Sequence, residues 1–141
     1  MSDKKLKALI NRYVEDGCNS GNLDVMDDVF ARDCTLFHPA VPEPMQGVEA
    51  LKGFMSAVLN AFPDFHVRVD EQFVSGDKVV NRGTVSGTFE HDFAGIPATG
   101  KHTEWTVIAI YRIADGRVVE MWEELDLLGA WQRLGVLPPM A

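Results

Sequence analysis

The stretch that decides the fold is Arg117-Val118-Val119-Glu120-Met121-Trp122-Glu123-Glu124-Leu125-Asp126, followed by Leu127-Leu128-Gly129-Ala130-Trp131-Gln132-Arg133-Leu134-Gly135. Up to Asp126 it predicts a β-strand, whose side chains alternate between the two faces of a sheet. One face then carries Val119, Met121, Glu123 and Leu125, and the other carries Glu120, Trp122, Glu124 and Asp126. Because an ionised carboxylate is costly to bury unless it is paired, the second face either meets solvent or lines a cavity that uses one of its acids.

Length and charge limit the classes of protein to consider. The 141 residues are enough for one domain, residues 1–141, with a core of its own. Thirteen basic against 21 acidic side chains give a formal net charge of −8 with no basic cluster, which argues against nucleic acid or an anionic membrane as partner. No signal-peptide core is present at the N-terminus, and no window approaches about 18 apolar residues. Cys18 and Cys34 show neither CxxC nor metal-type spacing, so we expect buried, reduced thiols in a cytoplasmic protein.

The first 62 residues predict mainly helix. Apolar residues recur at helical spacing from Leu6 to Cys18, after a cap at Ser2 or Asp3. A second short helix follows Asn22, and a third runs from Val48 to Phe62, where Pro63 ends it. Residues 34–38 between them read as a short strand before a proline-rich loop.

From His66 onward the periodicity changes to that of strands. We expect strands over residues 66–74, 78–89, 102–113 and 117–126, with tight turns at 75–77 and 114–116 and a loop over 90–101. Gly83 and Gly87 are expected bulge or bend points, which let a sheet curl against helices. Three helices followed by a curved antiparallel sheet predict an α+β fold.

Several strings in this second half occur together: Gly-Thr-Val-Ser-Gly-Thr-Phe at 83–89, Phe-Ala-Gly-Ile-Pro-Ala-Thr-Gly-Lys at 93–101, Arg-Ile-Ala-Asp-Gly-Arg-Val-Val-Glu-Met-Trp at 112–122, then Asp126 and Gln-Arg-Leu-Gly at 132–135. With Phe-Pro-Asp-Phe at 62–65, they resemble the SnoaL-like family of polyketide cyclases, also called ester cyclases. The resemblance implies a cone-shaped α+β barrel, as in nuclear transport factor, scytalone dehydratase and ketosteroid isomerase, with a deep and mostly apolar pocket. It also implies ring closure by intramolecular aldol condensation, without metal or organic cofactor.

The resemblance places the family's catalytic acid/base on Asp126, which shares its predicted face with Trp122. Proton abstraction next to a carbonyl needs a base whose pKa is tuned toward the working pH, and burial beside like charges raises the pKa of a carboxyl. We therefore hypothesise that Asp126 transfers the proton. His66 and His102, each at the start of a strand, are candidates for polarising the enolate oxygen, or else surface residues.

Six further residues are candidates for substrate binding: Trp122, Trp105, Phe89, Glu124, His38 and Arg82. Trp105 and Trp122 stack on a flat substrate or pack in the core. His38 lines the pocket mouth or merely ends a strand, and Arg82 neutralises a pocket carboxylate or faces solvent. Phe89 departs from the family, since many relatives carry His after Gly-Thr. The spacing of His and acidic residues is poor for a metal site, so no metal is expected.

Two classes of function stay open. The first is a cofactor-free cyclase, isomerase or hydrolase acting on a small hydrophobic compound that bears a carbonyl group. The second is a non-catalytic binding or accessory protein that keeps the pocket. A homodimer is expected through the apolar strip of Val119, Met121 and Leu125, which is larger than a monomer usually leaves exposed.

Overall fold

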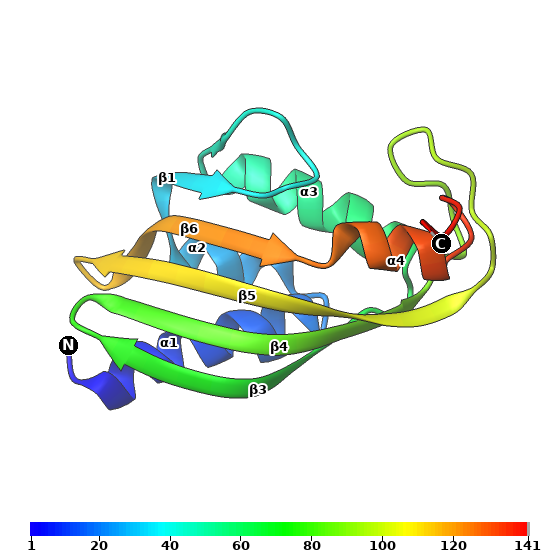
Figure 1. Cartoon of the computed structure of the whole chain (residues 1–141). Helices are drawn as coiled ribbons and strands as arrows, with labels where there is room; N and C mark the ends of the chain where they lie inside the picture. Colours follow the sequence, from blue (N-terminus) through cyan, green and yellow to red (C-terminus); the bar gives the residue numbers. More distant parts are fainter. Residues whose placement is uncertain (141) are drawn as a thin grey trace.

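The computed structural model describes residues 1–140 and shows a curved six-stranded sheet with the N-terminal helices against one face (Figure 1). Strand order across the sheet is β2-β1-β6-β5-β4-β3, so β2 and β3 are the edges and the sheet does not close into a complete barrel. All neighbouring strands are antiparallel except β1 and β6, which are parallel. This confirms the predicted α+β class and the curved sheet.

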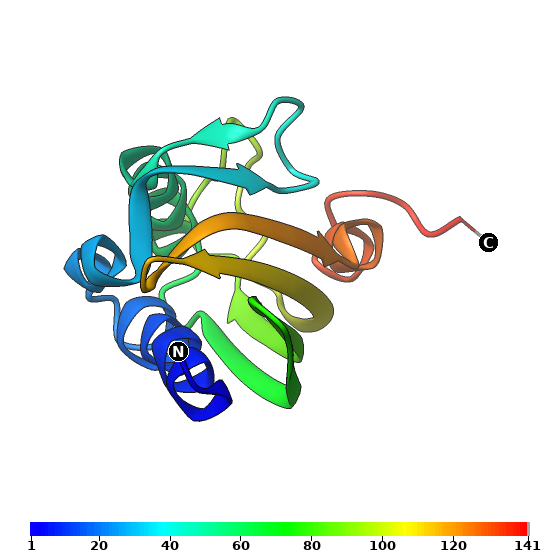
Figure 2. The same ribbon diagram turned by 90° about the vertical axis from the view of Figure 1, so that its left-hand side faces the viewer.

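Twelve elements make up the described chain. The helical ones are α1 (Asp3–Arg12), a π-helical segment (Tyr13–Cys18), a 3-10 turn (Leu23–Val25), α2 (Met26–Val29), α3 (Val48–Ala61) and α4 (Leu127–Arg133). The strands are β1 (Phe30–Phe37), β2 (Met45–Gln46), β3 (His66–Ser75), β4 (Lys78–Thr88), β5 (His102–Ala114) and β6 (Arg117–Leu125). The view in Figure 2 shows α1, α2 and α3 on one side of the bent strands.

Strand β1 is longer than the sequence indicates. It begins at Phe30 instead of Cys34, and the helix before it shrinks to a single turn. Phe30 and Leu36 are both almost fully buried, and β1 pairs with β6. Pairing with a distant strand thus overrides the local helical pattern, as strand formation often depends on tertiary context.

The face of β6 that was predicted to form the dimer interface packs against the core instead. Met121 is 2% exposed and faces the core, whereas Trp122 on the outer face stacks on Phe37. A bulge lies at Val119, because Arg112 pairs with Glu120 whereas Ile113 pairs with Val118. The expected dimer strip is therefore wrong: its Met121 is buried, and Leu125 also lines the interior cavity.

The first helix ends in a π-helical segment that joins the helical layer to the sheet. The backbone N–H of Asn19 donates to the Val14 carbonyl, five residues back, which is the π-helical pattern. The Asn19 side chain then bridges to edge strand β3: its amide donates to the Val67 carbonyl at 2.9 Å and accepts from the Val67 N–H at 2.8 Å. Both bonds are partly buried, so Asn19 fixes the helix end against the sheet edge.

We expect Asn19→Ala to lower the free energy of unfolding by about 2 kcal/mol, because two hydrogen bonds are lost and the Val67 backbone groups lose their partner. Urea unfolding measures the change. Asn60→Ala, at an exposed position of α3, is the matched control. Equal stability of the two variants would contradict a stabilising role for the two hydrogen bonds between Asn19 and Val67.

Candidate functional site

A cavity lies between the concave face of the sheet and the helices. Its volume is about 120 Å³, and its walls come from the π-helical segment, α3, strands β3 to β6, the loop after β4 and α4. The cavity is partly open to solvent, so a ligand larger than this volume can extend through its mouth. Aromatic rings gather near α4, where Phe93 and Trp131 lie 6.4 Å apart between ring centres. In Figure 1 this loop and α4 are at the end of the sheet where the C-terminus lies.

A small set of polar side chains interrupts these apolar walls: Tyr13, His38, Asn81, Tyr111 and Glu123. A mostly apolar cavity with a few polar groups is typical of binding sites for small molecules. Glu123 is the acidic residue among the lining residues of the described chain. It lies on β6 between Met121 and Leu125, two neighbours that also line the cavity.

Glu123 is paired with His38. The His38 Nε2 atom lies 3.6 Å from Glu123 Oε2, and the imidazole packs on the Phe54 ring at 4.8 Å between ring centres. The Glu123 side chain is 27% accessible and lines the cavity. Burial raises the pKa of Glu123 to about 7 and lowers the pKa of His38 to about 4.

The tautomer of His38 follows from its backbone contact. The Ala40 N–H donates to His38 Nδ1 at 3.0 Å, so Nδ1 is an acceptor. The proton of the neutral imidazole is therefore on Nε2, the atom that faces Glu123. Above about pH 7 the site thus holds a carboxylate beside a neutral hydrogen-bond donor. That combination can take a proton from carbon while supporting developing charge on oxygen.

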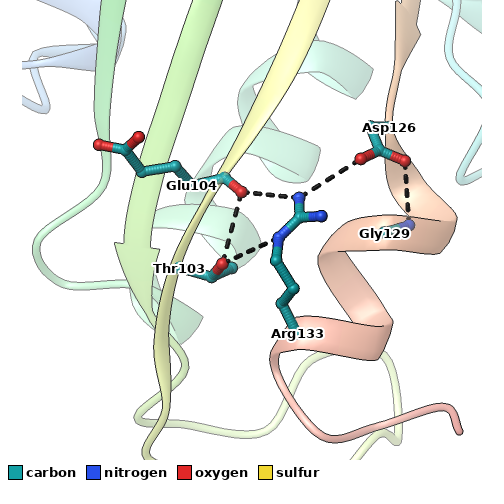
Figure 3. Close-up of polar contacts among 5 residues, drawn as sticks. All are labelled: Thr103, Glu104, Asp126, Gly129 and Arg133. Carbon is teal, nitrogen blue, oxygen red and sulfur yellow. Dashed lines mark hydrogen bonds and ion pairs between the residues drawn. The ribbon is translucent and has the colours of Figure 1, made fainter. Parts of the chain in front are cut away.

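Asp126 is not among the residues that line the cavity. Figure 3 shows its carboxyl group contacting Gly129 and Arg133 of α4. Its side chain is 45% exposed, accepts from the Gly129 N–H at 3.0 Å as the N-cap of α4, and lies 3.3 Å from Arg133. This corrects the expectation that Asp126 faces the pocket; the cause is that β6 ends at Leu125 and the chain turns into α4 there. A catalytic role for Asp126 stays an untested prediction.

The two other predicted catalytic residues also lie on the surface. His102 is 56% exposed and contacts Asp64 and Thr88, with its Nδ1 2.8 Å from the Thr88 hydroxyl. His66 is exposed at the start of β3. Neither lines the cavity, so the surface position, one of the two alternatives left open by the sequence, holds for both side chains. A catalytic role for either stays an untested prediction.

Among the predicted binding residues, Trp105 and His38 line the cavity. Phe89 is fully buried but packs against Phe62 and Trp131 without lining it. The remaining three, Trp122, Glu124 and Arg82, lie on the outer face of the sheet, and Arg82 pairs there with Glu71. Their outward direction follows from strand alternation, since their neighbours in sequence face the core.

The sequence interpretation missed Glu123, Asn81, Tyr13 and Tyr111. For Glu123 a signal was present: it is a lone carboxyl on a face otherwise made of apolar side chains. For Asn81 and the tyrosines, no local pattern distinguishes a residue that lines a cavity from one packed in the core.

The fold is of the ketosteroid isomerase type, with a mostly apolar cavity between the sheet and the helices. A family model of SnoaL-like polyketide cyclases matches residues 8–134. The chain belongs to the SnoaL-like polyketide cyclase family. A search of curated proteins finds no match.

Solved structures agree with this family. A protein from Jannaschia sp. CCS1, assigned as a SnoaL-like polyketide cyclase, has a TM-score of 0.87 at 25% identity, covering 97% of this chain and 95% of that one. TsrD from Streptomyces laurentii also has a TM-score of 0.87, at 28% identity and with 97% and 99% covered. IdmH from Streptomyces antibioticus, assigned as a polyketide cyclase, has a TM-score of 0.80 at 29% identity, with 93% and 99% covered.

Residues 1–140 show neither a cluster of metal ligands nor a membrane-spanning helix. Within that range, no group of three or more His, Cys, Asp or Glu residues is placed to hold a metal ion. None of the helices described there has the length and apolar character needed to cross a membrane.

Because the pKa of Glu123 is raised in the folded protein, we expect the free energy of unfolding to fall as the pH rises. Below about pH 4.5 the carboxyl is protonated in both folded and unfolded chains, and between pH 4.5 and 7 the unfolded chain releases its proton first. Wild type should therefore lose roughly 3 kcal/mol relative to Glu123→Gln as the pH rises through this window, at about 1.4 kcal/mol per pKa unit. Urea unfolding of both proteins, from about pH 4 to about pH 8, measures the difference.

Glu124→Gln, which removes the neighbouring carboxyl on the exposed face, is the control. A pH-independent difference between wild type and Glu123→Gln would contradict the desolvation of Glu123.

Proposed function

We propose that this protein is a cofactor-free polyketide cyclase that uses Glu123 as the general base, with the neutral His38 imidazole beside it. The observation that carries the proposal is the Glu123 carboxyl inside an apolar cavity, next to an imidazole whose Nε2–H faces it. The substrate class is a small hydrophobic compound that bears carbonyl groups, consistent with walls made mostly of aliphatic and aromatic side chains.

The reaction begins when a Glu123 oxygen removes a proton from the carbon next to a ketone. The electron pair of the broken C–H bond moves into the enolate, whose carbon attacks a second carbonyl of the same molecule and forms the ring bond. The resulting alkoxide takes the proton that Glu123 holds, which returns Glu123 to its carboxylate form. His38 stays neutral at these pH values because of its low pKa, so it donates from Nε2 without carrying a charge of its own.

A simple ketone tests the proton-transfer step. We use 2-tetralone, a flat bicyclic ketone, and follow loss of the C1 proton signal in deuterated water by NMR. The exchange rate with wild type should rise with pH and level off above about pH 7, as Glu123 loses its proton. Glu123→Gln should lower the rate by about 100-fold or more, the usual range for a general base.

Asp126→Asn is the matched control, since it changes a carboxyl of the neighbouring α4 cap without touching the cavity. Loss of exchange in Asp126→Asn with normal exchange in Glu123→Gln would reject our assignment in favour of Asp126. Saturable binding of 2-tetralone with no exchange in wild type would support the alternative, a non-catalytic binding protein.

We also propose a homodimer, through the outer face of the sheet instead of the strip first expected. Apolar residues lie in register across five strands: Phe73 pairs with Val80, Val80 with Ile110, Ile110 with Trp122, and Trp122 with Phe37. Phe73 is 49% exposed, and Ile108 beside this row is 51% exposed. A second copy of the same row would cover this surface, as in twofold dimers.

Sedimentation equilibrium should give twice the chain mass for wild type, and Ile108→Glu should shift the equilibrium toward the monomer because a charge enters an apolar interface. Asn60→Asp, on the surface of α3, is the control. A wild-type monomer at micromolar concentration would contradict this interface.

A further inference from the structure

Asn81 is a buried polar residue that the proton-transfer step described above does not use. It lies in the middle of β4, is 5% exposed, and lines the same cavity as Glu123. Burying an amide costs free energy unless both its donor and its acceptor groups find partners.

The carbonyl oxygen of the Asn81 side chain has a hydrogen-bond partner in the protein. Gln72 donates from Nε2 to Asn81 Oδ1 at 2.9 Å, and Gln72 itself is held by Asn11, whose Oδ1 accepts from the same Nε2 at 3.0 Å. This chain of amides runs from the helical layer through β3 to β4 and fixes the orientation of Asn81: Oδ1 faces Gln72, so the NH2 group faces away from it.

The NH2 group has no acceptor among residues 1–140. No side-chain nitrogen or oxygen in this part of the chain is both fully sealed and without a partner, so Asn81 Nδ2 touches open space. Because Asn81 is otherwise almost fully buried and lines the cavity, the cavity is the space available to Nδ2. The Asn81 amide thus brings two N–H donors, without a protein acceptor, to the wall of the cavity.

The register of the sheet places this donor opposite Glu123. Asn81 pairs with Ala109 on β5, and Ala109 pairs with Glu123 on β6, so the three side chains form one row on the concave face. Adjacent strands are about 4.8 Å apart, so the two outer Cα atoms of the row are separated by roughly 10 Å. Because the residue between them is alanine, no large side chain of β5 separates the amide from the carboxyl.

The cavity continues from this row along β4. The next inward position of β4 is Gly83, which lines the cavity although the Arg68 carbonyl oxygen lies 2.7 Å from where its Cβ would be. Beyond it, Val85 pairs with Trp105, and both also line the cavity. On the other side of the row, the cavity is closed by Val79 and Tyr111, which pair with each other and are almost fully buried. A ligand between the amide and the carboxyl would extend toward Gly83 and Trp105.

We propose that Asn81 binds the carbonyl oxygen of the ligand and stabilises the enolate that Glu123 generates. The carbonyl oxygen accepts from Nδ2–H, and the carbon that loses its proton lies over Ala109, between the amide and the carboxyl. Gln72 and Asn11 act as positioning residues that hold the amide in this orientation. This inference rests on the proposed function and adds to it the direction in which the carbonyl group is bound.

The test measures hydrogen bonding to the bound ketone directly. The probe is 2-tetralone labelled with carbon-13 at the carbonyl, whose C=O stretching frequency falls when the oxygen accepts a hydrogen bond. Infrared difference spectra are recorded for wild type, Asn81→Leu and Asn81→Ser, with Asn60→Leu as the surface control. Affinity for tetralin, which has the same rings but no oxygen, is measured in parallel by calorimetry.

We expect a lower C=O frequency in wild type and Asn60→Leu than in both Asn81 variants. The Asn81 variants should bind 2-tetralone more weakly but tetralin at least as well as wild type. The exchange rate should fall by about 100-fold, the usual effect of removing one such donor. Gln72→Met, which frees the amide, should broaden the C=O band, a change that a merely structural Asn81 would not produce.

The inference would be overturned by a C=O frequency that is the same in wild type and in both Asn81 variants, even if Glu123-dependent exchange is intact. Absence of saturable 2-tetralone binding to wild type would instead reject the proposed function, and this inference with it. Asn81→Ser keeps a small polar side chain too short to reach the ligand, so the comparison survives if Asn81→Leu fails to fold.

Discussion

The site depends on the desolvation of one carboxyl group. Glu123 has apolar neighbours on its own strand and faces the interior of the curled sheet, so its ionised form loses the hydration it would have in water. The nearby imidazole, kept neutral by its own burial, provides a donor without a full compensating charge. A carboxyl in this setting is a stronger base than an exposed one and is still ionised near neutral pH, which is the balance that general-base catalysis needs.

Two local features of the chain make this environment possible. The bulge at Val119 resets the alternation of β6, so Val118 and Met121 both face inward and Glu123 follows on the concave side. The π-helical segment places Tyr13, Val14 and Cys18 together on the cavity side, and Asn19 ties its end to β3. Unusual backbone of this kind often occurs at functional sites, where it redirects side chains.

Most of the fold could be predicted from the sequence. Long strands such as 78–88 and 102–114 have clear alternation and turn residues at their ends, and α3 ends close to Pro63 as expected. The site was harder, because alternation separates two faces without saying which one is inside. Because three acidic residues share a face with Trp122, the catalytic acid was predicted on that face, which is the outer one. A single acidic residue between the apolar Met121 and Leu125 is the stronger sign of a functional carboxyl, because charged residues are rarely buried. The role of Asp126 as a cap depends on where β6 stops, and strand ends are poorly determined by pattern.

The ionisation of Glu123 can be observed without any substrate. Infrared difference titration of wild type against Glu123→Gln isolates the carboxyl band of this residue, and its conversion to carboxylate should have a midpoint near pH 7. A midpoint near 4.5, the ordinary value for glutamate, would show that the carboxyl is solvated and would contradict a desolvated general base at this position.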